Sequence, residues 1–195
     1  METVDQTLLL KRILELSVQK PHLLIAIDGR CAAGKTTLAA HLRQAFSSNV
    51  IHMDDFFLHP EQRTPERMKE PGGNVDYERF QQEVIIPLRQ GQSFSYQPYD
   101  CHTQVMADEI TVEPRAVNII EGAYSCHPVL RGYYDYRIFL TVNPDEQYQR
   151  IISRNGEQGA AQFNEKWIPL EEQYFLFHKV LECCDAIHAS ERSGR

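Results

Sequence analysis

The sequence predicts an α/β fold in three layers: a mostly parallel sheet with helices on both faces, plus a small insertion made of a β-hairpin and a lid. Short apolar runs alternate with stretches of helical periodicity along most of the chain. A glycine-rich segment stands between the first apolar run and the helix expected after it. The 195 residues suffice for one well-buried domain and are short for two, so we expect a single domain over residues 1–195.

Composition and charge narrow the class of protein. The chain is 42% hydrophobic and 24% charged, which is typical of a soluble globular protein. Its net charge of −7 gives no global basic surface, so we expect no nucleic-acid or membrane partner, and a homo-oligomer stays open. The five cysteines show no metal-ligand spacing, which favours reduced thiols in the cytoplasm. We expect no secretory signal and no membrane span.

The first elements follow from hydrophobic periodicity. Residues 1–20 are expected to hold a leading amphipathic helix that ends before Pro21. The apolar residues 23–28 indicate a buried parallel strand. Residues 35–47 indicate a helix, and residues 49–53 indicate a second strand.

The middle of the chain is more polar. Residues 59–76 contain three prolines, a pair of glycines and many charges, so we expect a mobile functional loop that is too polar to pack. Helical spacing returns over residues 77–90, with Pro87 late in that helix. Alternating patches over residues 93–112 suggest a small antiparallel hairpin on the substrate side.

The last third alternates strands and helices again. Strands are expected over residues 116–120, 136–142 and 186–189, and helices over residues 145–154 and 170–184. This alternation predicts a parallel sheet.

The glycine-rich segment fits the phosphate-binding pattern G-x-x-x-x-G-K-[ST] in the context that it requires, after a strand and before a helix. Gly29 and Gly34 allow a tight wrap in which backbone N–H groups point at phosphate oxygens. Lys35 is expected to reach the β- and γ-phosphates, and the Thr36 hydroxyl is expected to bind Mg²⁺. The residues expected to bind the nucleotide are Gly29, Arg30, Cys31, Ala32, Ala33, Gly34, Lys35, Thr36, Thr37 and Arg150.

Cys31 has two interpretations. The helix N-terminus and Lys35 could lower the pKa of its thiol and make it oxidisable. The alternative, which we favour, is a small residue that simply fits the loop.

Acidic residues end the predicted strands, where parallel sheets bind ligands. Asp54 and Asp55 follow the second strand, and Glu121 follows the strand of residues 116–120. Phosphoryl transfer needs a metal ligand and a proton acceptor, so we favour functional roles for Asp54 and Glu121, with Thr36 and Glu121 as metal ligands. For Asp28, which closes the first strand, a structural role is an equal alternative. Which of the two adjacent aspartates faces the acceptor stays open.

Cations are expected beside the phosphates as well. Arg150 and Arg154 lie four residues apart, so one helix face could aim both at a polyphosphate from a lid over residues 150–165. The alternative is a solvated helix face. His102 and Tyr99 belong to a polar and aromatic cluster that could stack a base, or could simply stabilise the hairpin. No N-K-x-D motif is present, which argues against a GTPase switch.

Taken together, the chain from about residue 23 to residue 187 resembles the uridine kinase family of P-loop kinases, which includes nicotinamide riboside kinases and is akin to pantothenate kinase and phosphoribulokinase. The matching segments, in the order of the family, are residues 27–37, 53–57, 74–77, 98–100 and 119–122, followed by Arg150 and Arg154.

The resemblance implies a P-loop NTPase fold and an ATP- and Mg²⁺-dependent kinase acting on a primary hydroxyl, first of all the 5′-hydroxyl of a nucleoside. A nicotinamide riboside, pantothenate or sugar acceptor, and a non-catalytic nucleotide-binding regulator, stay open. The implied catalytic residues are Lys35, Asp54, Glu121 and Arg154. The resemblance makes Asp54 the general base, and it gives the substrate-binding residues as Asp54, Asp76 for the ribose, and Tyr99 with His102 for the base.

The sequence departs from the uridine-specific members in two places. Residues 101–104 follow Tyr99 and Asp100 at once, where those members have a longer stretch before a histidine and an arginine. Residues 155–159 lack the additional lid arginines of uridine kinases. The acceptor therefore stays open.

Overall fold

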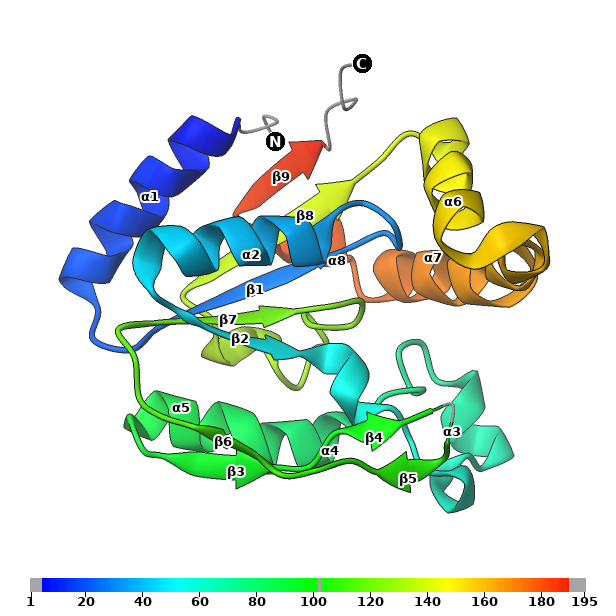
Figure 1. Ribbon diagram of the computed structural model, residues 1–195, viewed down its shortest axis with the longest axis horizontal. Helices are drawn as coiled ribbons and strands as arrows, with labels where there is room; N and C mark the ends of the chain where they lie inside the picture. Colours follow the sequence, from blue (N-terminus) through cyan, green and yellow to red (C-terminus); the bar gives the residue numbers. More distant parts are fainter. Residues whose placement is uncertain (1–4, 102, 190–195) are drawn as a thin grey trace.

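The centre of the protein is a five-stranded parallel sheet in the order β2-β7-β1-β8-β9 (Figure 1). The computed structural model describes residues 5–101 and 103–189. The strands are β1 Leu23–Gly29, β2 Asn49–His52, β7 Val117–Glu121, β8 Tyr136–Thr141 and β9 Ala186–Ala189. With helices covering both faces, the predicted three-layer α/β fold is confirmed.

The middle strand shows why the sheet has two apolar faces. All seven residues of β1 are buried, and their side chains alternate between the two sides. Leu23, Ile25 and Ile27 belong to one core cluster. Leu24 and Ala26 belong to the other. A continuous apolar run is therefore what this position in the sheet requires.

The first face is covered by α1 Gln6–Gln19 and α2 Lys35–Phe46. The carboxylate of Asp5 accepts a hydrogen bond from the Leu8 backbone N–H (2.8 Å) and so begins α1. The helix buries Leu9, Ile13 and Leu16 against the sheet. No helix among the described residues is long and apolar enough to cross a membrane.

The second face is covered by a helical stretch made of α4 Tyr77–Phe80, the π-helical η3 Gln81–Ile85 and α5 Ile86–Gln90. The π turn directly precedes Ile86 and Pro87. A wider turn there removes the clash that a proline ring makes with the preceding turn of an α-helix. The helix predicted over residues 77–90 is therefore present in spite of its proline.

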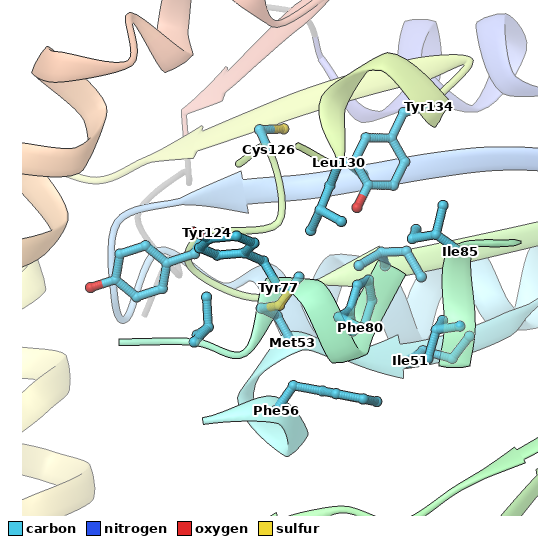
Figure 2. Close-up of a cluster of buried hydrophobic side chains, with 14 of the residues drawn as sticks. Ile51, Met53, Phe56, Tyr77, Phe80, Ile85, Tyr124, Cys126, Leu130 and Tyr134 are labelled. Atoms are coloured by element: carbon cyan, nitrogen blue, oxygen red, sulfur yellow. The ribbon is translucent and has the colours of Figure 1, made fainter. Parts of the chain in front are cut away.

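Figure 2 shows the core on this face. Phe80 of α4 meets Phe56 edge to face, with the ring centroids 4.8 Å apart. Phe56 and Met53 are both fully buried, and they end and begin the 3₁₀ turn η1 Met53–Phe56. Because these two side chains anchor the turn, its middle residues, Asp54 and Asp55, are directed away from the core.

The insertion below the sheet consists of two antiparallel strand pairs, so the predicted hairpin is present. Its strands are β3 Phe94–Tyr96, β4 Tyr99–Asp100, β5 Val105–Met106 and β6 Ile110–Val112. β3 pairs with β6, and β4 pairs with β5.

The C-terminal part contains more helix than expected. Its elements are η4 Arg131–Tyr133, α6 Pro144–Gln162, the π-helical η5 Phe163–Trp167, α7 Ile168–Phe177 and α8 Val180–Cys183. The helix predicted over residues 170–184 is broken after α7 because Lys179 adopts a φ of +51°. In α6, Gly156 interrupts the helical backbone with a φ of +70°.

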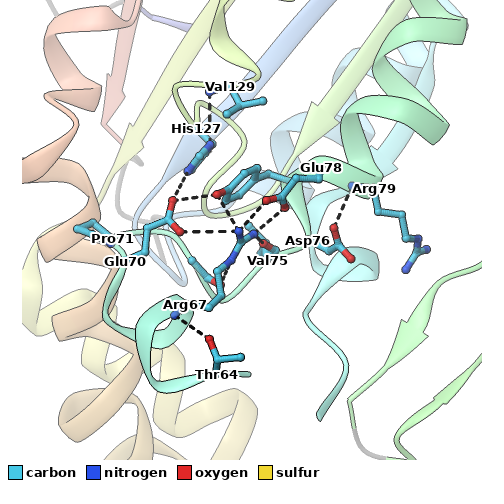
Figure 3. Close-up of polar contacts among 12 residues, drawn as sticks. Thr64, Arg67, Glu70, Pro71, Val75, Asp76, Glu78, Arg79, His127 and Val129 are labelled. Carbon is cyan, nitrogen blue, oxygen red and sulfur yellow. Dashed lines mark hydrogen bonds and ion pairs between the residues drawn. The ribbon is translucent and has the colours of Figure 1, made fainter. Parts of the chain in front are cut away.

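The expectation that residues 59–76 are too polar to pack is wrong. The segment contains η2 Pro60–Gln62 and α3 Pro65–Lys69. Arg67 donates to both carboxylate oxygens of Glu78 (2.7 Å each) and to the carbonyl oxygen of Gly73 (2.9 Å), and its guanidinium lies 4.0 Å from the centre of the Tyr77 ring (Figure 3). The charges satisfy one another, which sequence pattern alone did not show. Mobility of the segment stays a prediction.

We expect Arg67→Ala to lower the free energy of unfolding by about 2 kcal/mol, because it removes several charge-assisted hydrogen bonds and leaves their acceptors unpaired. Urea unfolding followed by circular dichroism measures the change. Lys69→Ala, which removes an exposed cation of the same helix, is the matched control. Equal stability of the two variants would contradict the role given to Arg67.

Candidate active site

The predicted phosphate-binding loop connects β1 to α2. Gly29 has a φ of +134°, and a Cβ there would lie 2.1 Å from the carbonyl oxygen of Leu140, so only glycine fits between β1 and β8. Gly34 has a φ of +92° and directly precedes α2. Nζ of Lys35 donates to the carbonyl oxygens of Gly29 (2.7 Å) and Arg30 (3.0 Å), which holds the ammonium group across the loop.

A cavity of about 1170 Å³ opens in front of this loop. Its walls come from the loop, the ends of the strands and the helical stretch from α6 to α7. The predicted site residues that line it are Cys31, Ala32, Ala33, Gly34, Lys35, Thr36, Thr37, Asp54, Glu121, Arg150 and Arg154. The phosphate-binding loop, the acids at the strand ends and the two arginines of α6 are therefore brought to one site.

Two residues of the loop motif, Gly29 and Arg30, do not line the cavity. Gly29 lies against β8, as described above. The Arg30 guanidinium donates to both carboxylate oxygens of Glu172 (2.6 and 3.1 Å) and to the Thr141 hydroxyl (2.7 Å). The Arg30 side chain therefore fastens the loop to α7 and is not among the cavity residues.

The acids at the strand ends form a connected group. Oε1 of Glu121 accepts a hydrogen bond from the Thr36 hydroxyl (3.1 Å) and lies 2.6 Å from Nδ1 of His52. Glu121 is 5% exposed. The hydrogen bond to Glu121 raises the pKa of His52.

Asp54, and not Asp55, faces the cavity. Its side chain is open to the cavity. The protein atoms around the cavity nevertheless partly desolvate the carboxyl group and raise its pKa, and the positive charge of Lys35 opposes this rise. Asp55 accepts a hydrogen bond from the hydroxyl of Tyr96 (3.1 Å). The order of the two aspartates, which the sequence left open, is set by the 3₁₀ turn that carries them.

Asp28 has the structural role. It is fully buried and accepts hydrogen bonds from the backbone N–H groups of Gly29 (2.7 Å) and Cys126 (2.8 Å) and from the hydroxyl of Tyr174 (2.8 Å). Burial raises the pKa of its carboxyl, and the three hydrogen bonds oppose that effect.

Of the residues implied for ribose and base binding, Asp76 and Tyr99 do not line the cavity. Asp76 is 6% exposed and caps α4, since it accepts a hydrogen bond from the Arg79 backbone N–H (2.9 Å; Figure 3). It also accepts one from the side-chain amide of Gln62 (2.6 Å). Tyr99 is 3% exposed and stacks on His59, with centroids 4.4 Å apart. His102 lies outside the described residues.

Sequence reasoning missed the side chains that hold the loop from the C-terminal helices. Glu171 of α7 accepts from the backbone N–H of Cys31 (2.8 Å), and Gln147 of α6 donates to the Cys31 carbonyl oxygen (3.0 Å). Arg150, which the sequence did indicate, contacts the loop as well, since it donates to the carbonyl oxygen of Ala32 (3.0 Å). A pair of glutamates in an otherwise aromatic stretch was the one signal that could have pointed to Glu171.

The thiol of Cys31 is not activated. Burial and the neighbouring Glu171 raise the pKa of Cys31 to about 12, against the lowering effect of Lys35. The interpretation with a lowered pKa is therefore wrong, and the favoured interpretation, a small residue that fits the loop, stands.

These residues fit magnesium and ATP. Thr36 and Glu121 present adjacent hard oxygen atoms, which Mg²⁺ prefers. Gly34 has open space where a side chain would stand, so its backbone is accessible to a phosphate. Lys35, Arg150 and Arg154 supply positive charge around the same space.

The glycine-rich loop lines one cavity with the carboxylate of Asp54 and with the paired oxygen atoms of Thr36 and Glu121. This combination defines a phosphate-loop nucleotide-binding protein. The chain belongs to the phosphoribulokinase/uridine kinase family, whose sequence profile matches residues 24–165. The predicted membership is thereby confirmed, and the family's members are kinases. No sequence among the curated proteins matches the chain.

Solved structures share the fold. A candidate fructose transport system kinase from Silicibacter sp. TM1040 is 21% identical, with a TM-score of 0.71, covering 95% of this chain and 98% of that one. A possible uridine kinase from Bacillus stearothermophilus is 23% identical, with a TM-score of 0.64 and coverage of 92% and 98%. D-glycerate 3-kinase from Cryptococcus neoformans var. grubii is 14% identical, with a TM-score of 0.59 and coverage of 85% and 88%. Similarity at these identities shows the fold alone.

Glu171 makes stability depend on pH. Burial raises its pKa from the ordinary 4.5 to about 7, so the folded state binds more protons than the unfolded state between these values, and stability falls as pH rises through them. Glu171→Gln stays neutral and keeps an acceptor oxygen. We expect the free energy of unfolding of this variant, relative to that of the wild type, to rise by about 3 kcal/mol between pH 4.5 and pH 8.

Urea unfolding across this pH range measures the difference. Glu157→Gln, at an exposed position of α6, is the control. Its free energy of unfolding is expected to change with pH in the same way as that of the wild type. Parallel curves for Glu171→Gln as well would contradict the raised pKa of Glu171.

Proposed function

We propose that the protein is an ATP- and Mg²⁺-dependent phosphotransferase that phosphorylates a primary hydroxyl of a small molecule, with Asp54 as the general base. The observation that carries this proposal is the presence of Asp54, Lys35 and the Thr36–Glu121 pair around one cavity. A binding loop alone would serve any nucleotide-binding protein. A carboxylate that lines the same cavity suits a protein that also transfers the phosphoryl group.

Each residue has a part in that reaction. Lys35 and the loop N–H groups bind the phosphates, and Thr36 and Glu121 hold Mg²⁺. When bound, the metal neutralises charge on the phosphate oxygens. Asp54 takes the proton of the acceptor hydroxyl while the oxygen bonds to the γ-phosphorus and ADP leaves. Because its pKa is raised, Asp54 is a stronger base than an ordinary aspartate.

Arg150 and Arg154 act from α6. Both line the cavity, and the guanidinium of Arg154 also lies 5.5 Å from the centre of the Phe163 ring. In this proposal they stabilise the charge that spreads over the transferred phosphoryl group and the leaving ADP.

The identity of the acceptor molecule is a separate question from the type of reaction. The resemblance implies a nucleoside, but Asp76 and Tyr99 are not among the cavity residues. The similar structures carry the names of a possible uridine kinase, a fructose transport system kinase and a D-glycerate 3-kinase. A panel of nucleosides, nicotinamide riboside, pantothenate, sugars and hydroxy acids with Mg-ATP, read by ADP release and mass spectrometry, therefore tests the proposal. Failure to phosphorylate any member favours the alternative of a non-catalytic regulator.

We expect Asp54→Asn to lower kcat by about a hundredfold to ten-thousandfold on whichever acceptor is found, with the affinity for ATP unchanged, because the variant loses the proton acceptor alone. Steady-state kinetics and nucleotide titration separate the two effects. Asp55→Asn, next to it and outside the cavity, is the control and is expected to keep most of the wild-type kcat. A fully active Asp54→Asn would refute the assignment of the base.

A further inference from the structure

We call the part of the cavity wall that follows Asp54 in the chain the acceptor side. It contains one cation, Arg63, that has not been assigned to the nucleotide. Arg63 lines the cavity together with Phe57, Met68 and Asn74, all from the chain that follows Asp54. The cations assigned to the triphosphate belong instead to the phosphate-binding loop and to α6.

Arg63 is held in a fixed orientation. Its Nε and Nη2 both donate to the carbonyl oxygen of Leu58 (3.0 and 2.8 Å), which sets the plane of the guanidinium. Nη1 makes no hydrogen bond to another described residue and remains available to a ligand. The backbone N–H of Arg63 donates to Pro60 (3.2 Å), so the residue closes the short turn η2.

Asp76 contributes to this arrangement. Its carboxylate accepts from the side chain of Gln62, the residue before Arg63, and from the backbone of Arg79. Asp76 is also buried and does not line the cavity, so it is not placed to accept hydrogen bonds from the hydroxyls of a sugar bound there. The acceptor side therefore offers a cationic donor where a ribose site would offer an anionic acceptor.

Arg63 and Asp54 both line the cavity, and so does Cys101. The pKa of the Cys101 thiol is raised by burial, lowered by Arg63 and raised by Asp100 and Asp54. A molecule bound there would have its hydroxyl at the carboxylate of Asp54 and another part of its structure at the guanidinium.

We propose that the acceptor carries an anionic group, a carboxylate or a phosphate ester, which Arg63 binds while the hydroxyl lies at Asp54. This inference rests on the proposed function and narrows its acceptor to one chemical class. Guanidinium and carboxylate or phosphate make strong charge-assisted hydrogen bonds. The aromatic rings of Phe57 and Trp167, with centroids 6.3 Å apart, form an apolar wall for the carbon skeleton.

The test uses pairs of acceptors that share a hydroxyl-bearing skeleton, of which one member carries an anionic group and the other does not. Pantothenate is compared with pantothenol, and glycerate and glycerol 3-phosphate are compared with glycerol. We expect the wild type to favour the anionic member of each productive pair by roughly tenfold to a hundredfold in kcat/KM. The glycerate and glycerol 3-phosphate arms distinguish a carboxylate from a phosphate ester.

Variants assign the preference to Arg63. Arg63→Met is expected to raise KM for the anionic acceptor by about tenfold or more and to leave KM for the neutral analogue unchanged. Arg63→Lys keeps the charge and is expected to recover part of the preference. Lys69→Met, which removes an exposed cation of the same segment outside the cavity, is the matched control.

Binding is measured separately from turnover. Trp167 is the only tryptophan of the chain and lines the cavity, so its fluorescence reports on ligands added with a non-hydrolysable Mg-ATP analogue. The inference is overturned if neutral and anionic members bind equally, if no anionic member binds, or if Arg63→Met weakens both members alike. Binding of anions that depends on Arg63, without phosphorylation of any panel member, would support the inference and contradict the proposed function.

Discussion

The buried carboxylate of Asp28 is the contact on which the geometry of the site depends. It joins three segments that are far apart in the sequence: the start of the phosphate-binding loop, the backbone at Cys126 and the helix α7 at Tyr174. A buried carboxyl group is costly unless hydrogen bonds satisfy it. Because each of the three donors comes from a different segment, displacing one of them leaves part of the carboxylate unpaired. Asp28 therefore fixes the segments relative to one another.

Two walls of the cavity depend on this arrangement. The bond to Cys126 holds the turn after β7, in which Gly122 and Tyr124 adopt φ values of +139° and +73° and line the cavity beside Glu121. Such a backbone is retained only where its surroundings impose it. The bond to Tyr174 places α7 so that Glu171 reaches the loop backbone. The loop is thus held by the sheet from one side and by α7 from the other.

These long-range contacts explain why the sequence revealed some parts of the site and not others. Asp54 and Glu121 could be predicted to meet because the carboxyl ends of parallel strands share one edge, whatever the detail of packing. The strands and most helices could be predicted because their patterns are local. The roles of Asp28 and Glu171 depend on partners about a hundred or more residues away, and no local pattern records such a partner. The same holds for Asp76, whose position matches a ribose-binding acid but whose carboxylate is occupied by Gln62.

In the proposed function, the nucleotide and the acceptor are bound by different parts of the chain. The groups for the nucleotide and the metal lie on or next to the parallel strands, where the core fixes them from both faces. In the proposed function, the acceptor binds beside a short segment over residues 59–76, which is held by polar contacts of Arg67 and Asp76 rather than by the sheet. A change in that segment can alter which molecule is bound without disturbing the loop that binds the phosphates. The name of a similar structure is therefore a poor guide to the acceptor, whereas the side chains of this segment bear on it directly.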